Sequence, residues 1–227
     1  MPSLASEMMI TYESLRQNEE IRTLIARADD SLRVLGYTEH SFSHVCRVAD
    51  TAGYILETLG YSEHDVELVR IAAYLHDIGN LVNRVEHSQS GAVMAFVLLS
   101  KLGMDMEDIA TVTTAIGNHH EGTGVPVNAI AAALILGDKA DVRRSRVRQD
   151  EGTMPDIHDR VNYSVTASEL TIDAPKTTVH LSITIDTIHS SVADYFEIFM
   201  ERMLLCRHAA KRLGLCFTLS INDQPVM

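Results

Sequence analysis

The segment AIAAALILGDKAD at residues 129–141 consists almost wholly of small and apolar side chains. A helix that is apolar on every side has to be buried on every side, so this segment predicts a central helix with other elements packed around it. Asp138 interrupts the apolar sequence. A carboxylate there carries a large desolvation cost unless it binds a metal or pairs with a cation such as Lys139 or Arg143.

The rest of the first ~150 residues has the apolar spacing of helices. One helix is expected to begin at Ser62, which can cap it, and to end near Gly79. The other helices are expected within 14–36, 40–59, 88–102 and 106–117.

The pattern changes after Arg148. The polar stretch 149–156 resembles a linker, and 178–186 alternates strictly between apolar and polar residues, as a half-buried strand does. A weaker strand is expected at 161–170, a helix at 191–213 and a last strand at 215–221. These features predict a mainly α protein, with a helical domain at 1–150 and a small α+β extension at 151–227. The extension is expected to be a β-β-α-β unit with an antiparallel sheet, which packs on the helical domain or forms a homodimer, because an open sheet needs its edge covered.

The overall composition excludes some classes of function. A net charge of −12 and a pI near 5.3 argue against broad binding of nucleic acid. The three cysteines form no Cys-x-x-Cys pair, which is typical of reduced thiols in the cytoplasm. The N-terminal sequence lacks the features of a signal peptide, and the apolar runs are shorter than the ~20 residues of a membrane helix. We therefore expect a soluble cytoplasmic protein that binds no membrane.

Histidine is concentrated in the helical half, which holds seven of the eleven histidines. His76 and Asp77 stand side by side at the end of an apolar helix, in AYLHDIGN. A single histidine is more often a packed or surface residue than a ligand, and His76 could simply be an imidazolium stabilised by the helix dipole. Several imidazoles and carboxylates brought together by helices would instead suit Fe, Mn, Zn, Ni or Co.

The ordered run of His44, His76-Asp77 and Asp138 resembles the H…HD…D signature of the HD superfamily of metal-dependent phosphohydrolases. The resemblance covers about residues 35–145. It implies an HD-type helical bundle with two divalent transition metal ions, of which Fe or Mn are favoured. It also implies that Asp77 bridges the ions and is the catalytic residue that orients the attacking water. The implied ligands are His44, His76, Asp77 and Asp138 for the first ion, and Asp77, His87, His119 and His120 for the second.

Three features depart from the family pattern. Asn80 stands where many relatives have a lysine that can meet a phosphate. The segment HHEGTGVP resembles a shortened HD-GYP stretch with GVP in place of GYP, which argues against cyclic di-GMP as the substrate. The extension is not part of the common HD core. His40, four residues before His44 and expected on the same helix face, matches a third-metal position that is usually Glu.

The basic run KADVRRSRVR at 139–148 can supply a phosphate contact near Asp138, or it can be a solvated helix end. The candidate substrate-binding residues are His40, Asn80, Lys139, Arg143 and Arg144.

The expected function is hydrolysis of a phosphate ester, either a nucleotide or a small phosphorylated metabolite, by metal-activated water at a binuclear site. Two alternatives remain open. Some HD relatives, such as inositol oxygenase, use the same ligands for a di-iron oxygenase, and a metal-retaining module could bind a nucleotide and regulate a partner. The complete ligand set argues against a fully decayed site.

Overall fold

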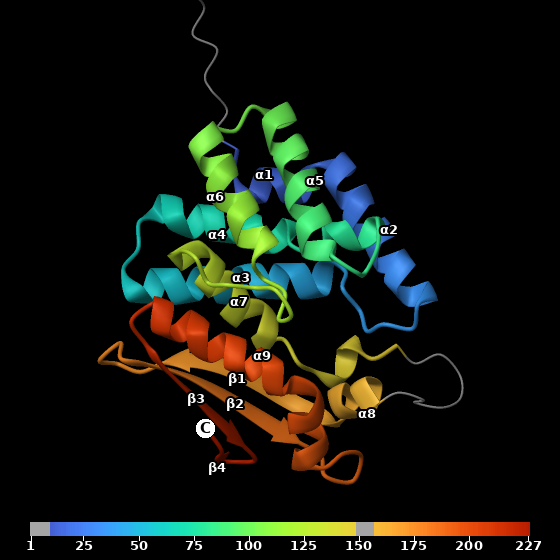
Figure 1. The fold of residues 1–227 in the computed structure, drawn as a ribbon, viewed down its shortest axis with the longest axis vertical. Helices are drawn as coiled ribbons and strands as arrows, with labels where there is room; N and C mark the ends of the chain where they lie inside the picture. Colours follow the sequence, from blue (N-terminus) through green and yellow to red (C-terminus); the bar gives the residue numbers. More distant parts are fainter. Residues whose placement is uncertain (1–9, 149–156) are drawn as a thin grey trace, which may run out of the picture.

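The computed structural model describes residues 10–148 and 157–227. Helices form one layer, and a small sheet covered by a long helix lies against it (Figure 1). The elements of the helical layer are α1 (Tyr12–Gln17), α2 (Glu19–Val34), α3 (Phe42–Leu59), α4 (Glu63–Leu75), η1 (Ile78–Leu81), α5 (His87–Leu102), α6 (Met106–Gly117), α7 (Ala129–Ala140) and η2 (Arg144–Arg146).

Helix α7 occupies the centre of the molecule. Every residue from Ile130 to Gly137 is buried. The helix contacts α3, α4 and α6 within the helical layer and α9 of the extension. Gly137 permits the close approach of α3, because a Cβ there would lie 3.0 Å from Val48 O. The prediction of a central apolar helix is therefore confirmed.

Two predicted helix boundaries are wrong. The stretch 14–36 is broken into α1 and α2, because the Asn18 side chain accepts a hydrogen bond from Ile21 N and starts a new helix. Ser62 caps α4 as expected, but the helix ends at Leu75. Gly79 lies in η1 and serves close packing against α5 instead of a helix cap.

The extension contains α8 (Ile157–Ser164), β1 (Val165–Ile172), β2 (Thr178–Ile185), α9 (Val192–Arg212), β3 (Cys216–Ile221) and β4 (Gln224–Pro225). Residues 161–164, expected in a strand, are helical. The expectation of an antiparallel sheet is also wrong: β1 and β2 are antiparallel, but β2 and β3 are parallel. The reason is that α9 is a crossover helix, which allows the next strand to run in the same direction as the one before it.

Both sides of α9 are packed, one against α7 and the other against the sheet (Figure 1). The outer edge of β1 is covered by the helical layer, where Arg47 Nη2 donates to Ser168 O at 3.2 Å and Ile172 N donates to Tyr54 Oη at 3.3 Å. The chain therefore covers this strand edge itself. A homodimer through the extension stays a prediction. The predicted linker 149–156 and the domain boundary at 150 lie outside the described residues, and none of the described helices could cross a membrane.

Replacing Gly79 with alanine should destabilise the protein. The new Cβ would lie 2.0 Å from His87 O and 2.5 Å from Gly91 N, and neither backbone atom can move without shifting α5. We expect a loss of about 1–3 kcal/mol in the free energy of unfolding, measured by urea denaturation. The control is Gly117→Ala, where the nearest atom is 3.6 Å away. Equal stability of the two variants would contradict this account of η1 and α5.

Candidate metal centre

Six of the seven predicted ligands lie together between the helices. Their ligand atoms form three overlapping groups, in each of which all atoms lie within 4.8 Å of one another. The groups are His44, His76 and Asp77; His76, His119 and Asp138; and Asp77, His87 and His119. The residues come from α3, α5, α7 and the C-terminal ends of α4 and α6, so the packing of five helices brings the donors together.

One set of donors converges on the Asp77 Oδ2 side. His44 Nε2 lies 3.5 Å from Asp77 Oδ2 and 3.4 Å from Asp138 Oδ1. His76 Nε2 lies 3.1 Å and 3.7 Å from the same two oxygens. Two imidazole nitrogens and two carboxylate oxygens thus surround one point.

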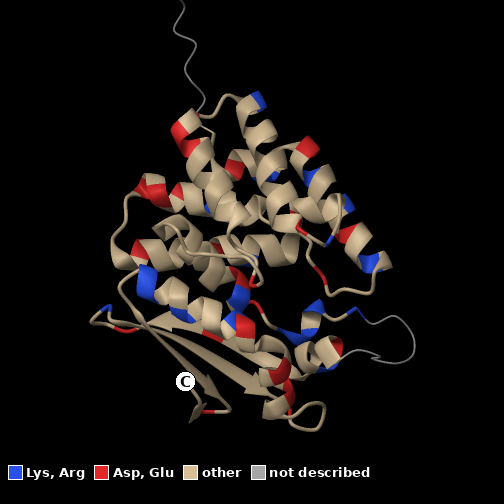
Figure 2. Cartoon of the chain, viewed as in Figure 1, with Lys and Arg blue, Asp and Glu red and all other residues tan. Residues whose placement is uncertain are grey.

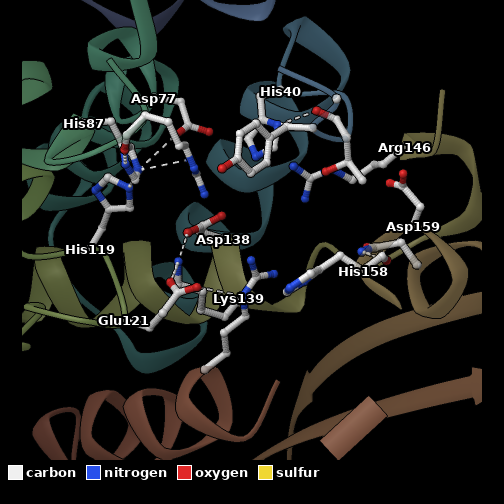
Figure 3. Close-up of a pocket in the computed structure, with 16 residues that line it drawn as sticks. His40, Asp77, His87, His119, Glu121, Asp138, Lys139, Arg146, His158 and Asp159 are labelled. Carbon is white, nitrogen blue, oxygen red and sulfur yellow. Dashed lines mark hydrogen bonds and ion pairs between the residues drawn. The ribbon is translucent and has the colours of Figure 1, made fainter. Parts of the chain in front are cut away.

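A second set lies on the Asp77 Oδ1 side. This oxygen is 3.5 Å from His87 Nε2, which in turn is 3.2 Å from His119 Nε2. The two oxygens of Asp77 therefore face different groups of imidazoles, as a carboxylate that bridges two ions would. Figure 3 shows Asp77 beside His87 and His119, with Asp138 below them on α7.

The proton positions on these rings follow from their other contacts. A carbonyl oxygen can only accept, so a ring whose Nδ1 meets one carries its proton on Nδ1 and leaves Nε2 with a lone pair. Three rings meet carbonyl oxygens: His76 Nδ1 with Ala73 O at 2.7 Å, His87 Nδ1 with Arg84 O at 3.0 Å, and His119 Nδ1 with Ile116 O at 2.6 Å. His44 Nδ1 meets Asp141 Oδ2 at 2.8 Å.

These residues fit a metal. His44 Nε2 and His76 Nε2 are buried and have no hydrogen-bond partner among the described residues. His87 and His119 direct two lone pairs at each other across 3.2 Å. Buried donors and acceptors without partners are costly, and a cation at each point would satisfy them. Mixed imidazole and carboxylate donors suit borderline divalent metals.

Burial sets the protonation of the second group. It lowers the pKa of His119 far below its usual value and that of His87 to about 4, so both rings are neutral, the form that binds metal. Burial and the nearby Arg146 also disfavour a charged His44. The neighbouring carboxylates of Asp138, Asp141 and Asp77 outweigh both effects and raise the pKa of His44 to about 10. A metal entering there has to displace a proton.

Asp141 was missed by the sequence analysis as a functional residue. Its carboxylate accepts from His44 Nδ1 and from Arg143 Nε, both at 2.8 Å, and lies 3.2 Å from Arg47 Nε. It therefore holds both the orientation and the tautomer of His44. Its spacing of three residues from Asp138 at the end of an apolar helix was the available signal.

Asn80 and Lys139 are buried next to the ligands. The Asn80 amide nitrogen donates to Asp77 O and Asp77 Oδ1, both at 2.9 Å, and its oxygen accepts from Arg84 Nη1 at 3.2 Å. Lys139 Nζ lies 2.7 Å from Asp138 Oδ2 and 2.7 Å from Glu121 Oε2. Burial opposes the charge on Lys139, but these carboxylates raise its pKa above the usual value.

His120 and His40 lie at the margin of the cluster. The His120 ring packs edge-on against His87, with 5.0 Å between ring centroids, and its atoms belong to none of the three groups. His40 precedes α3, so the expectation that it shares a helix face with His44 is wrong. Its Nδ1 meets Thr38 O at 2.6 Å, and the residue lines the pocket described below.

The structure places Arg143 and Arg144 away from the cluster. Arg143 is held by Asp141 and donates to Ser43 Oγ at 2.9 Å. Arg144 donates to Tyr163 O at 2.6 Å and stacks on that ring. Neither belongs to the pocket lining. Because the chain turns after α7, Arg146 is the residue of the basic run, besides Lys139, that lines the pocket.

A pocket of about 200 Å³ opens in front of the ligands. Its charged lining residues are the cations Arg84, Lys139, Arg146 and Arg202 and the carboxylates Asp77, Glu121, Asp138 and Asp159. Figure 2 shows segments of both signs where the helical layer meets the extension.

The extension supplies part of the pocket wall: Arg202 comes from α9, and His158, Asp159 and Asn162 come from α8. The sequence analysis assigned His158 no role in a site. Nothing in the local sequence shows that α8 returns to the ligands, because tertiary packing places it there.

Comparison with known proteins places these residues in a family. The HD domain family model matches residues 41–151. The uncharacterized protein MJ1020 of Methanocaldococcus jannaschii is 28% identical over 219 residues, which cover 86% of this chain and 82% of that protein. The crystal structure of a predicted HD superfamily hydrolase from an uncultured Thermotogales bacterium shares 26% identity, with a TM-score of 0.45, and covers 59% of this chain and 75% of that one.

Changing Asp141 to asparagine should weaken metal binding without removing a ligand. Asparagine keeps the volume but loses the charge that holds the His44 Nδ1 proton. We expect affinity to fall about 10–100-fold, measured by competition with a chelator. The control is Asp108→Asn, because Asp108 makes a similar 2.8 Å contact with His64 at the surface. Unchanged affinity would show that Asp141 does not support the site.

Proposed function

The chain is an HD-domain protein, and we propose that it is a metal-dependent phosphohydrolase that cleaves a small phosphate ester. His44, His76, Asp77 and Asp138 would hold one divalent ion, and Asp77, His87 and His119 a second. The mixed imidazole and carboxylate donors favour Fe or Mn. Bound ions of this kind lower the pKa of a coordinated water and offset the charge of a phosphate.

The balance of charge in the pocket is the observation that supports this proposal. Four cationic side chains face four carboxylates, so the metal-free lining is close to neutral when its histidines are uncharged. Each bound divalent ion would then leave the pocket with a net positive charge. A pocket whose charge becomes positive on metal binding favours an anionic ligand, and phosphate esters are the anions on which such sites act.

Arg84 is the proposed phosphate anchor. Among the described residues, Lys139, Arg146 and Arg202 each form an ion pair with a carboxylate, and Arg84 does not. Its guanidinium is held by Asn80 Oδ1, stacks 5.4 Å from the Tyr37 ring centre and lies 3.5 Å from His87 Nε2. It is therefore fixed beside the second group of ligands and keeps its charge available for a bidentate contact with phosphate.

Asn80 has a positioning role in this proposal. It contacts both Asp77 and Arg84, so the bridging carboxylate and the phosphate anchor are held through one amide. The family resemblance puts a lysine at this position in many relatives. Here the positive charge would come from Arg84, four residues further on.

The first test is the metal content of protein purified without oxygen, measured by elemental mass spectrometry. We expect about two transition-metal ions per chain, and their loss in Asp77→Ala, because this carboxylate faces both groups of imidazoles. The loaded protein should release phosphate from phosphomonoesters, and the variant should not. Bound metal without phosphate release from any ester would contradict the proposal, as would oxygen consumption in its place.

Arg84→Met should raise KM for a phosphomonoester while metal content stays unchanged. A hydrogen bond to a charged group contributes about 1.5–3 kcal/mol, which corresponds to a change of roughly 10–150-fold. Steady-state phosphate release measures KM and kcat separately. The control is Arg16→Met, because Arg16 also stacks on a tyrosine, 5.5 Å from the Tyr12 ring centre, but lies away from the pocket. An unchanged KM would remove Arg84 from the site.

A further inference from the structure

The pocket is lined mostly by residues with polar side chains. Among the residues that the structure describes, no aliphatic side chain lines the pocket. Every lining residue except Gly36 carries a polar side-chain atom. Ligand pockets are usually lined mostly by hydrophobic and aromatic side chains with a few polar groups, so this lining points to a ligand with many polar groups.

The size of the pocket, more than its lining, disfavours a nucleotide, because a base can stack on imidazole and guanidinium groups as well as on larger aromatic rings. Tyr37 is the one aromatic side chain, other than histidine, among the described lining residues, and the Arg84 guanidinium already lies over its ring. The volume of about 200 Å³ is below the ~300–1,000 Å³ of pockets for drug-sized ligands. The size of the pocket therefore favours a short ligand without a base.

The wall formed by the extension is suited to hydroxyl groups. In the view of Figure 3, His158 and Asp159 lie across the pocket from His87 and His119. Asn162 joins them on α8, and its amide nitrogen donates to His158 O at 2.8 Å, which leaves the amide oxygen to accept. A carboxylate and an amide oxygen accept hydrogen bonds from hydroxyls. An ammonium group would be disfavoured once metal is bound, because the pocket would then carry a net positive charge.

We propose that the ligand is a short hydroxyl-bearing monophosphate, a polyol or sugar phosphate, whose hydroxyl end is recognised by α8 of the extension. This inference rests on the proposed function for the position of the phosphate, at the metal ligands and Arg84. The hydroxyls then meet Asn162 and Asp159 on the opposite wall. The extension is in this way a specificity element of the pocket that the HD domain opens.

The test compares two ligand pairs that differ only by two hydroxyl groups. Glycerol 1-phosphate and propyl phosphate are compared as substrates by phosphate release. Their phosphonate analogues, 3,4-dihydroxybutylphosphonate and butylphosphonate, are compared as ligands of the metal-loaded protein by calorimetry. We expect the hydroxylated member of each pair to be preferred about 10-fold or more, because polar groups of the wall are left unpaired by the other.

The variant Asn162→Leu tests whether the preference for the hydroxylated ligand comes from the pocket wall formed by α8. Leucine has the same branched arrangement of heavy atoms as asparagine, although it is bulkier, and it cannot accept a hydrogen bond. The variant should lose most of the preference for dihydroxybutylphosphonate, and its affinity for butylphosphonate and its metal content should be unchanged. If the variant does not fold, the comparison of ligand pairs on the unaltered protein still decides the ligand class.

The outcomes separate this inference from the proposed function. The inference would be overturned by equal binding of the two phosphonates, by binding of neither, or by a preference for nucleoside monophosphates. If the protein still hydrolyses phosphate esters in any of these cases, the proposed phosphohydrolase function stands. Preference for the diol without hydrolysis of any ester would leave the ligand class standing and overturn the phosphohydrolase.

Discussion

Asp77 is the point on which the rest of the structure depends. Its two oxygens face two groups of imidazole nitrogens, and it is held by the residue that follows the turn, Asn80. Burial of this carboxylate opposes its charge, but the adjacent rings of His76 and His44 outweigh burial, so the pKa of Asp77 lies well below the usual value. The ends of α4, α5 and α6 meet beside Asp77. At these ends the backbone carbonyls accept hydrogen bonds from Nδ1 of three histidine ligands, His76, His87 and His119. Ring orientation is thus set by the backbone as well as by side chains.

The extension is linked to the same centre through charged side chains. Arg202 Nε on α9 lies 2.9 Å from Glu121 Oε1, Glu121 contacts Lys139, and Lys139 contacts Asp138. The chain of ion pairs runs from α9 of the extension to the ligand on α7. Since these groups are largely buried, loss of one partner would leave a buried charge uncompensated. The covered edge of β1 and this chain of ion pairs both tie the extension to the helical layer.

Much of this arrangement could be predicted from the sequence. The apolar run around Asp138 required a central helix, the strict alternation at 178–186 gave a strand, and the spacing of His44, His76 and Asp77 led to the family. What escaped prediction depends on contacts between distant segments. Arg202 and Asn162 belong to ordinary helical sequence, and Arg144 was favoured over Arg146 although the turn after α7 decides which of them faces the pocket. The parallel pairing of β2 and β3 likewise depends on where α9 packs, which alternation within a strand does not encode.

Asn80, at a position where the family resemblance implies a lysine in many relatives, connects these observations. A lysine at that position would bring its charge directly beside Asp77, whereas Asn80 holds the charge on Arg84 at the start of the turn into α5. With the cation on Arg84, the phosphate of the proposed substrate would lie on the side of His87, and the rest of the ligand would extend toward α8. The polar wall of the extension then becomes relevant to recognition. On this account, Asn80 in the helical domain and the polar wall of the extension would both serve the recognition of a short, hydroxyl-bearing ligand.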